Sequence, residues 1–135
     1  MNPKGHINMD DARKKTRFLS EFSCAFGPTP DTPRSGTITS IGLRECFVKT
    51  KAIVIEGQSL HVRVWMPENR WLRLSGRVKY HMERVGFGVV FHELSEEQLA
   101  DLSGLVEQLR RRHLAQRQED EAAADPAAVN PTVFN

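Results

Sequence analysis

The stretch GTITSIGLRECFVKT, residues 36–50, decides how this chain folds. It opens with β-branched residues in alternation, which suit a pleated and half-buried strand. After Gly42 the apolar residues resume, at Leu43, Cys46, Phe47 and Val48. A glycine inside such a run marks either a β-bulge or a point where another group approaches the backbone closely. We therefore predict one bulged strand over residues 36–50, with Gly42 as its irregular position.

Alternating apolar residues predict four more strands around this stretch. A period of two is the pattern of a strand with one buried face, and the run FLSEFSCAF follows it. The predicted strands are Phe18–Phe26, Leu60–Met66, Trp71–Tyr80 and Gly86–Phe91. Clusters of Gly, Pro, Asn and Asp separate them. Short strands at this spacing predict a mainly β protein, either a small antiparallel barrel or a sandwich.

The last predicted element is a helix with strong signals at its start. Ser95 and Gln98 fit a capping box, in which the serine hydroxyl accepts from a backbone amide and the glutamine reaches back. An apolar stripe follows, at Leu99, Leu102, Leu105, Val106 and Leu109. We expect the basic run 110–113 to complement the negative end of the helix dipole.

Composition and charge place the chain among ordinary soluble domains. Its 135 residues suggest one domain, and a net charge of +2 is too small to indicate DNA binding by itself. No apolar run approaches the roughly 20 residues that cross a bilayer, and the N-terminus has no secretory signal. We therefore expect a cytoplasmic protein without membrane insertion. Cys24 and Cys46 are expected to be buried thiols, because neither has the spacing of a metal site.

No pattern of residues indicates an enzyme. The sequence has no paired acid and base, no nucleophile elbow and no spacing of metal ligands. We expect His61, His81 and His92 at the surface or at strand edges. Trp65 and Trp71 flank a predicted turn, and we expect them to pack in the core or at the rim of the barrel. The sequence predicts a binding protein with no cofactor.

The order of these features resembles the PilZ domain family. Members of that family have a basic RxxxR segment before the first strand, and Arg13 and Arg17 stand in that position here. The following strand of the family carries the motif [DN]xSxxG, which falls on Thr37, Thr39 and Gly42. The resemblance implies a PilZ-type split β-barrel with a C-terminal α-helix.

The same resemblance implies how the chain is divided. The run GVVF at residues 88–91 and the helix start after it are similar to the last strand and helix of the family. The PilZ domain would span residues 13–114. A flexible arm, residues 1–12, would precede it, and a disordered polar tail, residues 115–135, would follow.

The implied ligand is cyclic di-GMP, a bacterial second messenger with two guanines and two phosphates. A guanidinium fork can donate paired hydrogen bonds to guanine O6 and N7 or to phosphate oxygens, so Arg13 and Arg17 would hold the ligand from a mobile segment. Thr37, Thr39 and Gly42 would form the strand side of the site. Ligand binding would fold the arm onto the barrel and create a surface for a downstream protein partner of motility, pilus or exopolysaccharide machinery.

Two departures from the family motif leave an alternative open. Thr39 keeps the hydroxyl of the usual serine, but Thr37 replaces an Asp or Asn whose oxygen would accept from a guanine edge. A lost base contact of roughly 1–3 kcal/mol would weaken binding by about 10- to 100-fold. The alternative is a degenerate PilZ adaptor that binds a protein partner without nucleotide.

Overall fold

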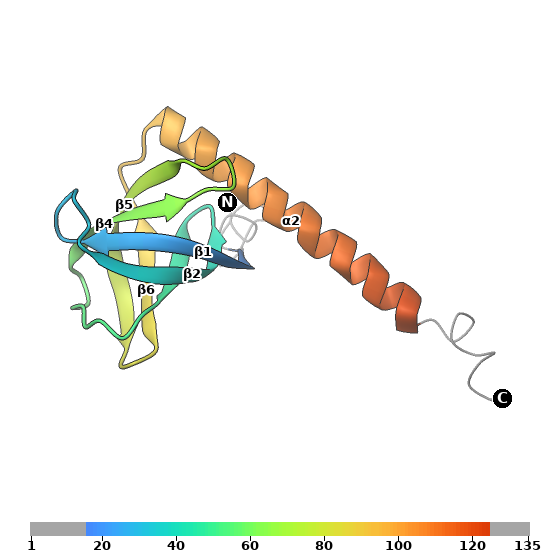
Figure 1. Ribbon diagram of the computed structural model, residues 1–135, viewed down its shortest axis with the longest axis horizontal. Helices are drawn as coiled ribbons and strands as arrows, with labels where there is room; N and C mark the ends of the chain where they lie inside the picture. Colours follow the sequence, from blue (N-terminus) through green and yellow to red (C-terminus); the bar gives the residue numbers. More distant parts are fainter. Residues whose placement is uncertain (1–15, 125–135) are drawn as a thin grey trace, which may run out of the picture.

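The computed structural model describes residues 16–124, whose main chain forms six strands and one long helix. The elements are β1 (Arg17–Gly27), β2 (Arg34–Gly42), β3 (Glu45–Lys49), β4 (Ser59–Trp65), β5 (Trp71–Met82), β6 (Gly86–Phe91) and α2 (Glu96–Ala124). The strands pair antiparallel and close into a barrel in the order β1-β2-β3-β6-β5-β4. The first half of α2 packs against the barrel, and its second half projects away from it (Figure 1). The mainly β fold with a C-terminal helix is confirmed.

The stretch 36–50 forms a hairpin, so the prediction of one continuous bulged strand is wrong. β2 ends at Gly42, the chain turns through the next two residues, and β3 returns antiparallel to β2. This pairing places Thr37 opposite Lys49. The fully buried residues of the stretch are Ile38, Ile41, Cys46 and Val48, each 0 % exposed. The turn explains this burial, because it lets both halves of the stretch point apolar side chains into the same barrel.

The irregular position of β2 is Thr39, not Gly42. Relative to β3, Thr39 is an extra residue between two paired neighbours. Relative to β1, Ser20 and Glu21 together stand opposite it. The Ser20 hydroxyl donates a hydrogen bond to the carbonyl oxygen of Ile38 at 2.8 Å, which ties the two irregular segments together. Bulges bend a strand and re-aim its side chains, so this region of the barrel wall is bent.

Apolar side chains fill the interior of the barrel. Phe26 and Phe87 meet edge to face there, with ring centroids 5.0 Å apart, and both are 0 % exposed. Cys24 and Cys46 are buried free thiols, as predicted. Burial raises the pKa of Cys24 to about 12 and raises the pKa of Cys46 as well. Both side chains therefore stay neutral and act as small apolar residues.

The helix begins where the capping box predicts. The Ser95 amide donates to Gln98 Oε1 at 2.7 Å, and the Gln98 amide donates to Ser95 Oγ at 3.0 Å. The buried part of the apolar stripe comprises Leu102, Leu105, Val106 and Leu109. Leu99 is 44 % exposed, so the stripe that packs on the barrel begins one step later than predicted.

The helix continues beyond the point where the sequence suggests its end. The basic run 110–113 lies inside α2, so the prediction that it complements the helix end is wrong. Arg110 and Arg111 instead pair with Glu107, at 2.7 and 3.0 Å. These pairs lie three and four residues apart, a spacing at which opposite charges stabilise a helix.

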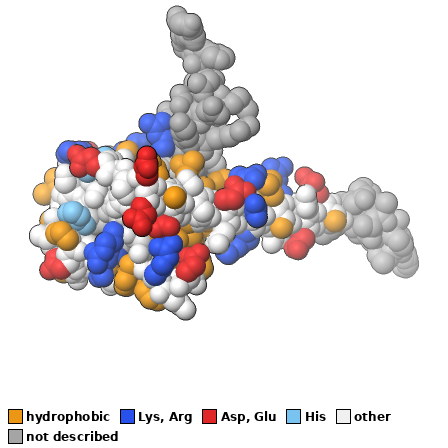
Figure 2. All heavy atoms as spheres, turned by 90° about the horizontal axis from the view of Figure 1, so that it is seen from above, with side chains coloured by type: hydrophobic (Ala, Val, Ile, Leu, Met, Phe, Trp, Pro, Cys, Tyr) orange, Lys and Arg blue, Asp and Glu red, His pale blue; other side chains and the backbone are white. Residues whose placement is uncertain are grey.

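The predicted disordered tail begins as helix, because residues 115–124 belong to α2. An ion pair between Arg117 and Glu121 at 3.9 Å supports this segment, and the sequence has no proline between Glu96 and Pro126 that would end the helix earlier. Figure 2 shows positive and negative side chains interspersed along the projecting part of α2. Within residues 16–124, no helix is both long enough and apolar enough to span a membrane.

Candidate functional site

The start of β1 and the end of β2 lie directly beside each other. Arg17 and Gly42 are register partners in the antiparallel pair. A Cβ atom added to Gly42 would lie 2.0 Å from the carbonyl oxygen of Thr16 and 3.3 Å from the Cα of Arg17. Gly42 therefore admits a close approach, but the group that approaches is the chain's own backbone where it enters β1. The glycine fixes the base of the arginine segment next to the β2–β3 turn.

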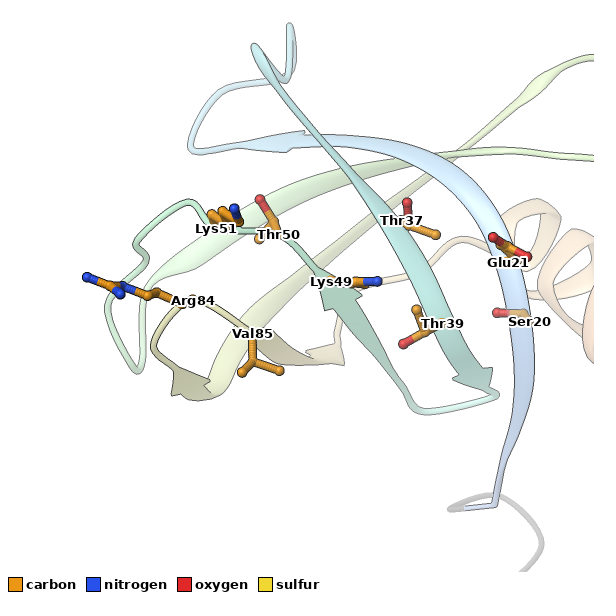
Figure 3. A pocket seen from close by; sticks show the side chains of 9 residues that line it. All are labelled: Ser20, Glu21, Thr37, Thr39, Lys49, Thr50, Lys51, Arg84 and Val85. Atoms are coloured by element: carbon orange, nitrogen blue, oxygen red, sulfur yellow. The ribbon is translucent and has the colours of Figure 1, made fainter.

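Thr37 and Thr39 lie together in a hollow on the outer face of the barrel (Figure 3). The hollow has a volume of about 310 Å³. It lies over β1, β2 and the end of β3, and the turn between β5 and β6 forms its far side. Its lining residues are Ser20, Glu21, Thr37, Thr39, Lys49, Thr50, Lys51, Arg84 and Val85. The residues of the two bulges, Ser20, Glu21 and Thr39, all line this hollow.

The two threonine hydroxyls are available to a ligand. Within residues 16–124, neither Thr37 nor Thr39 uses its hydroxyl in a hydrogen bond to another residue, whereas Ser20 uses its own to hold the bulge. Thr37 stands opposite Lys49, so a hydroxyl and an ammonium group stand side by side on this wall. Hydroxyl and ammonium groups together can donate to phosphate oxygens and accept from a base edge.

The charges around the hollow favour an anion. Lys49, Lys51 and Arg84 line it, against one carboxylate, Glu21. None of these four makes an ion pair with another residue of the described chain. Cations that lack partners at a concave surface raise the local concentration of anions. The hollow is therefore suited to a negatively charged ligand.

The far side of the hollow is held by backbone contacts. The Thr50 amide donates to the carbonyl oxygen of Val85 at 3.2 Å, which joins the segment after β3 to the β5–β6 turn. The Thr50 hydroxyl accepts from the Ala52 amide at 3.1 Å. Arg84 has a positive φ of 66°, a turn conformation uncommon for a residue with a side chain. These constraints hold Lys51 and Arg84 at the same edge.

The structure brings together part of the predicted site. Thr37 and Thr39 share the hollow, and Arg17 and Gly42 lie at the adjoining strand ends. Arg13 lies outside the described residues. Arg17 lies beside Gly42 at the edge of this face, and the ligand-binding roles of the five residues stay predictions.

The cations of the hollow were missed in the sequence. Lys49 and Lys51 follow directly on the apolar run 46–48, but a single strand over 36–50 would place Lys49 far from Thr37. Only the hairpin brings the two together. Arg84 lies in the turn predicted around residues 83–86, and nothing in its local sequence ties it to β2. The signal that could have found Lys49 is the restart of apolar alternation after Gly42.

Comparison with known proteins identifies the fold. No protein-family model matches this sequence, and no curated protein matches it. Among solved structures, the Bacillus subtilis inhibitor of motility (MotI/DgrA) matches with a TM-score of 0.59 at 15 % identity, over 73 % of this chain and 49 % of that chain. The PilZ domain of CeSA from a cellulose-synthesizing bacterium matches with a TM-score of 0.58 at 15 % identity, over 71 % of this chain and 99 % of that chain.

A third solved structure was determined with a ligand. The PilZ domain of YcgR from Escherichia coli, with c-di-GMP, matches with a TM-score of 0.57 at 13 % identity, over 78 % of this chain and 95 % of that chain. This chain thus spans about half the length of the inhibitor, at 49 %, and nearly all of the two isolated PilZ domains. The protein has a PilZ-type fold.

Proposed function

We propose that this protein is a cyclic di-GMP receptor that acts as an adaptor and not as an enzyme. The ligand would occupy the outer face of β1, β2 and β3. The observation that carries the proposal is the hollow that joins Thr37 and Thr39 to Lys49 on a PilZ-type barrel. A structural neighbour, the YcgR domain, was solved with this ligand, which supports the choice of nucleotide.

The geometry suggests a division of roles between wall and arm. The hollow of about 310 Å³ lies at the lower end of the roughly 300–1,000 Å³ that ligand pockets usually enclose, and we expect it to hold part of a cyclic dinucleotide. Arg17, at the edge of this face, and Arg13 before it would cover the remainder. Their guanidinium groups would donate to guanine O6 and N7 or to phosphate. Lys49 would add positive charge near a phosphate.

Replacement of the usual Asp or Asn by Thr37 lowers the expected affinity. A threonine hydroxyl offers less acceptor capacity toward a guanine edge than a carboxylate. We expect binding in the micromolar range, about 10- to 100-fold weaker than with the acidic residue. Lys49, opposite Thr37, offsets part of this loss by its attraction to phosphate.

Calorimetric titration of the full chain with cyclic di-GMP tests the proposal. We expect saturable heat with the wild type and a loss of at least about tenfold in affinity for Arg17→Ala combined with Arg13→Ala, since charge-assisted hydrogen bonds are the stronger ones. Arg112→Ala is the matched control, because Arg112 is exposed on α2. An absence of heat up to about millimolar ligand, roughly the weakest affinity of interest, would reject the proposal.

A second candidate is an adaptor that binds its protein partner without nucleotide. Glu21 favours it, since a carboxylate in the hollow repels phosphate. Thr37→Asp separates the two candidates: binding that appears only in this variant supports the nucleotide-free adaptor. In both cases we place the protein in the cytoplasm with a partner of motility, pilus or exopolysaccharide machinery, since one structural neighbour is an inhibitor of motility.

A further inference from the structure

A second outward face of the barrel, on β4 and β5, carries arginines and an exposed pair of tryptophans. In the closed barrel, β1 separates β4 from β2 and β6 separates β5 from β3. The β4–β5 face therefore lies across the barrel from the hollow, beside the start of α2 (Figure 1). Nothing in the proposed nucleotide site uses it.

Two arginines face each other directly on this surface. Arg63 of β4 is the register partner of Arg73 of β5. Like charges at directly opposed positions destabilise a strand pair. Within residues 16–124, neither arginine forms an ion pair with a carboxylate. An anion that bridges the two guanidinium groups would relieve this repulsion, so we expect the arginine pair to attract an anion.

Arg63 is held in position before any partner arrives. Its Nε donates to Thr32 Oγ1 at 2.7 Å, and its guanidinium lies 4.5 Å from the centroid of the Trp71 ring. Thr32 is buried and 3 % exposed, which makes it a fixed acceptor. These contacts orient the plane of the guanidinium, and a guanidinium in a fixed orientation loses less freedom on binding.

The tryptophans add apolar surface at one end of the arginine pair. Trp65 and Trp71 are register partners whose rings meet edge to face at 4.9 Å, and they are 39 % and 38 % exposed. At the other end is a groove of about 200 Å³. The residues that matter in its lining are Pro30, His61, Arg63, Arg73, Ser75 and Gln98. Exposed tryptophan and arginine are the residue types that dominate binding energy at protein interfaces.

We propose that this face, defined by Arg63, Arg73, Trp65 and Trp71, binds an acidic segment of a partner protein. Carboxylates of the segment would accept paired hydrogen bonds from the two guanidinium groups, and an apolar residue beside them would pack on the tryptophans. The face acts independently of nucleotide binding, so it extends the proposed function without depending on it.

The surroundings favour a peptide over a nucleic acid. Carboxylates border the face near Arg70, where Asp101 pairs with the guanidinium at 2.9 Å and Glu68 and Glu97 contribute negative charge. A phosphate backbone running along the face would meet these acids. A short acidic segment, in contrast, needs only the width of the arginine pair.

The protein reports on this face through its own fluorescence. It has only two tryptophans, and both belong to the face. Titration of the full chain with a glutamate-rich peptide that has a central leucine should change the tryptophan emission and saturate. We expect the double variant Arg63→Gln with Arg73→Gln to lower the affinity for the peptide by at least about tenfold. Arg112→Gln on α2 should leave this affinity unchanged. Arg73→Gln alone, at an exposed position, keeps the Arg63 contacts and guards against loss of folding.

Four results would overturn the proposal. The first is no peptide binding up to about millimolar concentration, and the second is binding that both arginine variants retain in full. The third is equally tight binding of an oligothymidylate with the same arginine dependence, which assigns the face to nucleic acid. The fourth is self-association lost in the arginine variants, which assigns it to a second copy of the chain. None of them changes the expected cyclic di-GMP titration.

Discussion

Two faces of one barrel differ in how their strands pair, because β1, β2 and β3 have register shifts between them and β4 pairs with β5 in continuous register. The β1–β2–β3 face has register shifts on both sides of Thr39, and it is hollowed. The β4–β5 face pairs without a shift from Ser59 to Trp65, and it presents opposed arginines and tryptophans at its surface. A hollow lined by hydroxyls and cations suits a compact anion, whereas exposed tryptophans and arginines along two strands suit an extended segment. We therefore propose two kinds of recognition on one fold, a nucleotide on the β1–β2–β3 face and an acidic peptide on the β4–β5 face.

The largest expected effect comes from the core that both faces share. Phe87 lies on β6, between the two faces, and is 0 % exposed. Phe87→Ala should lower the free energy of unfolding by about 3–5 kcal/mol, as for other buried phenylalanines. It should also weaken nucleotide binding and peptide binding together. Urea denaturation measures the stability. Val90→Ala on the same strand is the control, since Val90 is 36 % exposed. If the Phe87 variant lost binding at only one face, the idea that both faces depend on the same core would be contradicted.

A smaller effect, confined to one face, is expected at Gly42. A Cβ there would lie 2.0 Å from the Thr16 carbonyl oxygen, so Gly42→Ala must displace the start of β1. We expect a loss of about 1–3 kcal/mol, typical of overpacking, and weaker cyclic di-GMP binding with an unchanged peptide titration. Gly104→Ala is the control, because its Cβ would meet no atom within 4 Å and alanine favours a helix by about 1 kcal/mol. Equal nucleotide affinity in the Gly42 variant would show that the base of the arm is unimportant.

Thr37→Asp should strengthen nucleotide binding on the β1–β2–β3 face and leave the β4–β5 face unaffected. The carboxylate restores an acceptor toward the guanine edge, worth roughly 1–3 kcal/mol, so nucleotide affinity should rise by about tenfold or more. The peptide titration at Arg63 and Arg73 should not change. Calorimetry measures the first and tryptophan fluorescence the second. Thr39→Ser keeps its hydroxyl and serves as the control; unaltered nucleotide binding in the Thr37 variant would place the guanine elsewhere.

The smallest effect is expected on α2, outside both faces. Arg110 and Arg111, hydrogen bonded to Glu107, lower the pKa of that carboxyl to about 2. Because the folded pKa lies below the unfolded one, the stabilisation is present above the ordinary carboxyl pKa and is lost as the pH falls toward about 2. Glu107→Gln should therefore cost little stability at neutral pH, since the pair is exposed, and nothing at low pH. Thermal melts of the wild type and the variant across this pH range test the prediction. A difference in melting temperature that persists at low pH would assign the role of Glu107 to packing.

The sequence predicts what depends on local pattern. Alternation predicts the strands around Phe26 and Phe87, and the spacing of Ser95 and Gln98 predicts the helix start. The hairpin at Gly42 escaped detection because a two-residue turn between apolar runs looks like a bulge in one strand. The cations of the hollow escaped with it, since Lys49 meets Thr37 only through long-range pairing.

The β4–β5 face was not predicted from the sequence for a related reason. Arg63 and Arg73 each look like an ordinary outward residue of a strand, and only the register of β4 against β5 brings them opposite each other. The position where α2 ends was not predicted, because charge pairs such as Arg117 with Glu121 extend the helix beyond its apolar stripe. Local pattern therefore predicts the elements, and pairing between distant residues determines the sites.

The most direct test of a nucleotide site on the bent wall is a titration of the isotope-labelled protein with cyclic di-GMP, followed through its backbone amide resonances. We predict saturable shifts at Arg17, Thr37, Thr39 and Lys49, with the amides of Arg63 to Trp71 unmoved. Shifts centred on β4 and β5, or no shifts at saturating ligand, would contradict the proposed site.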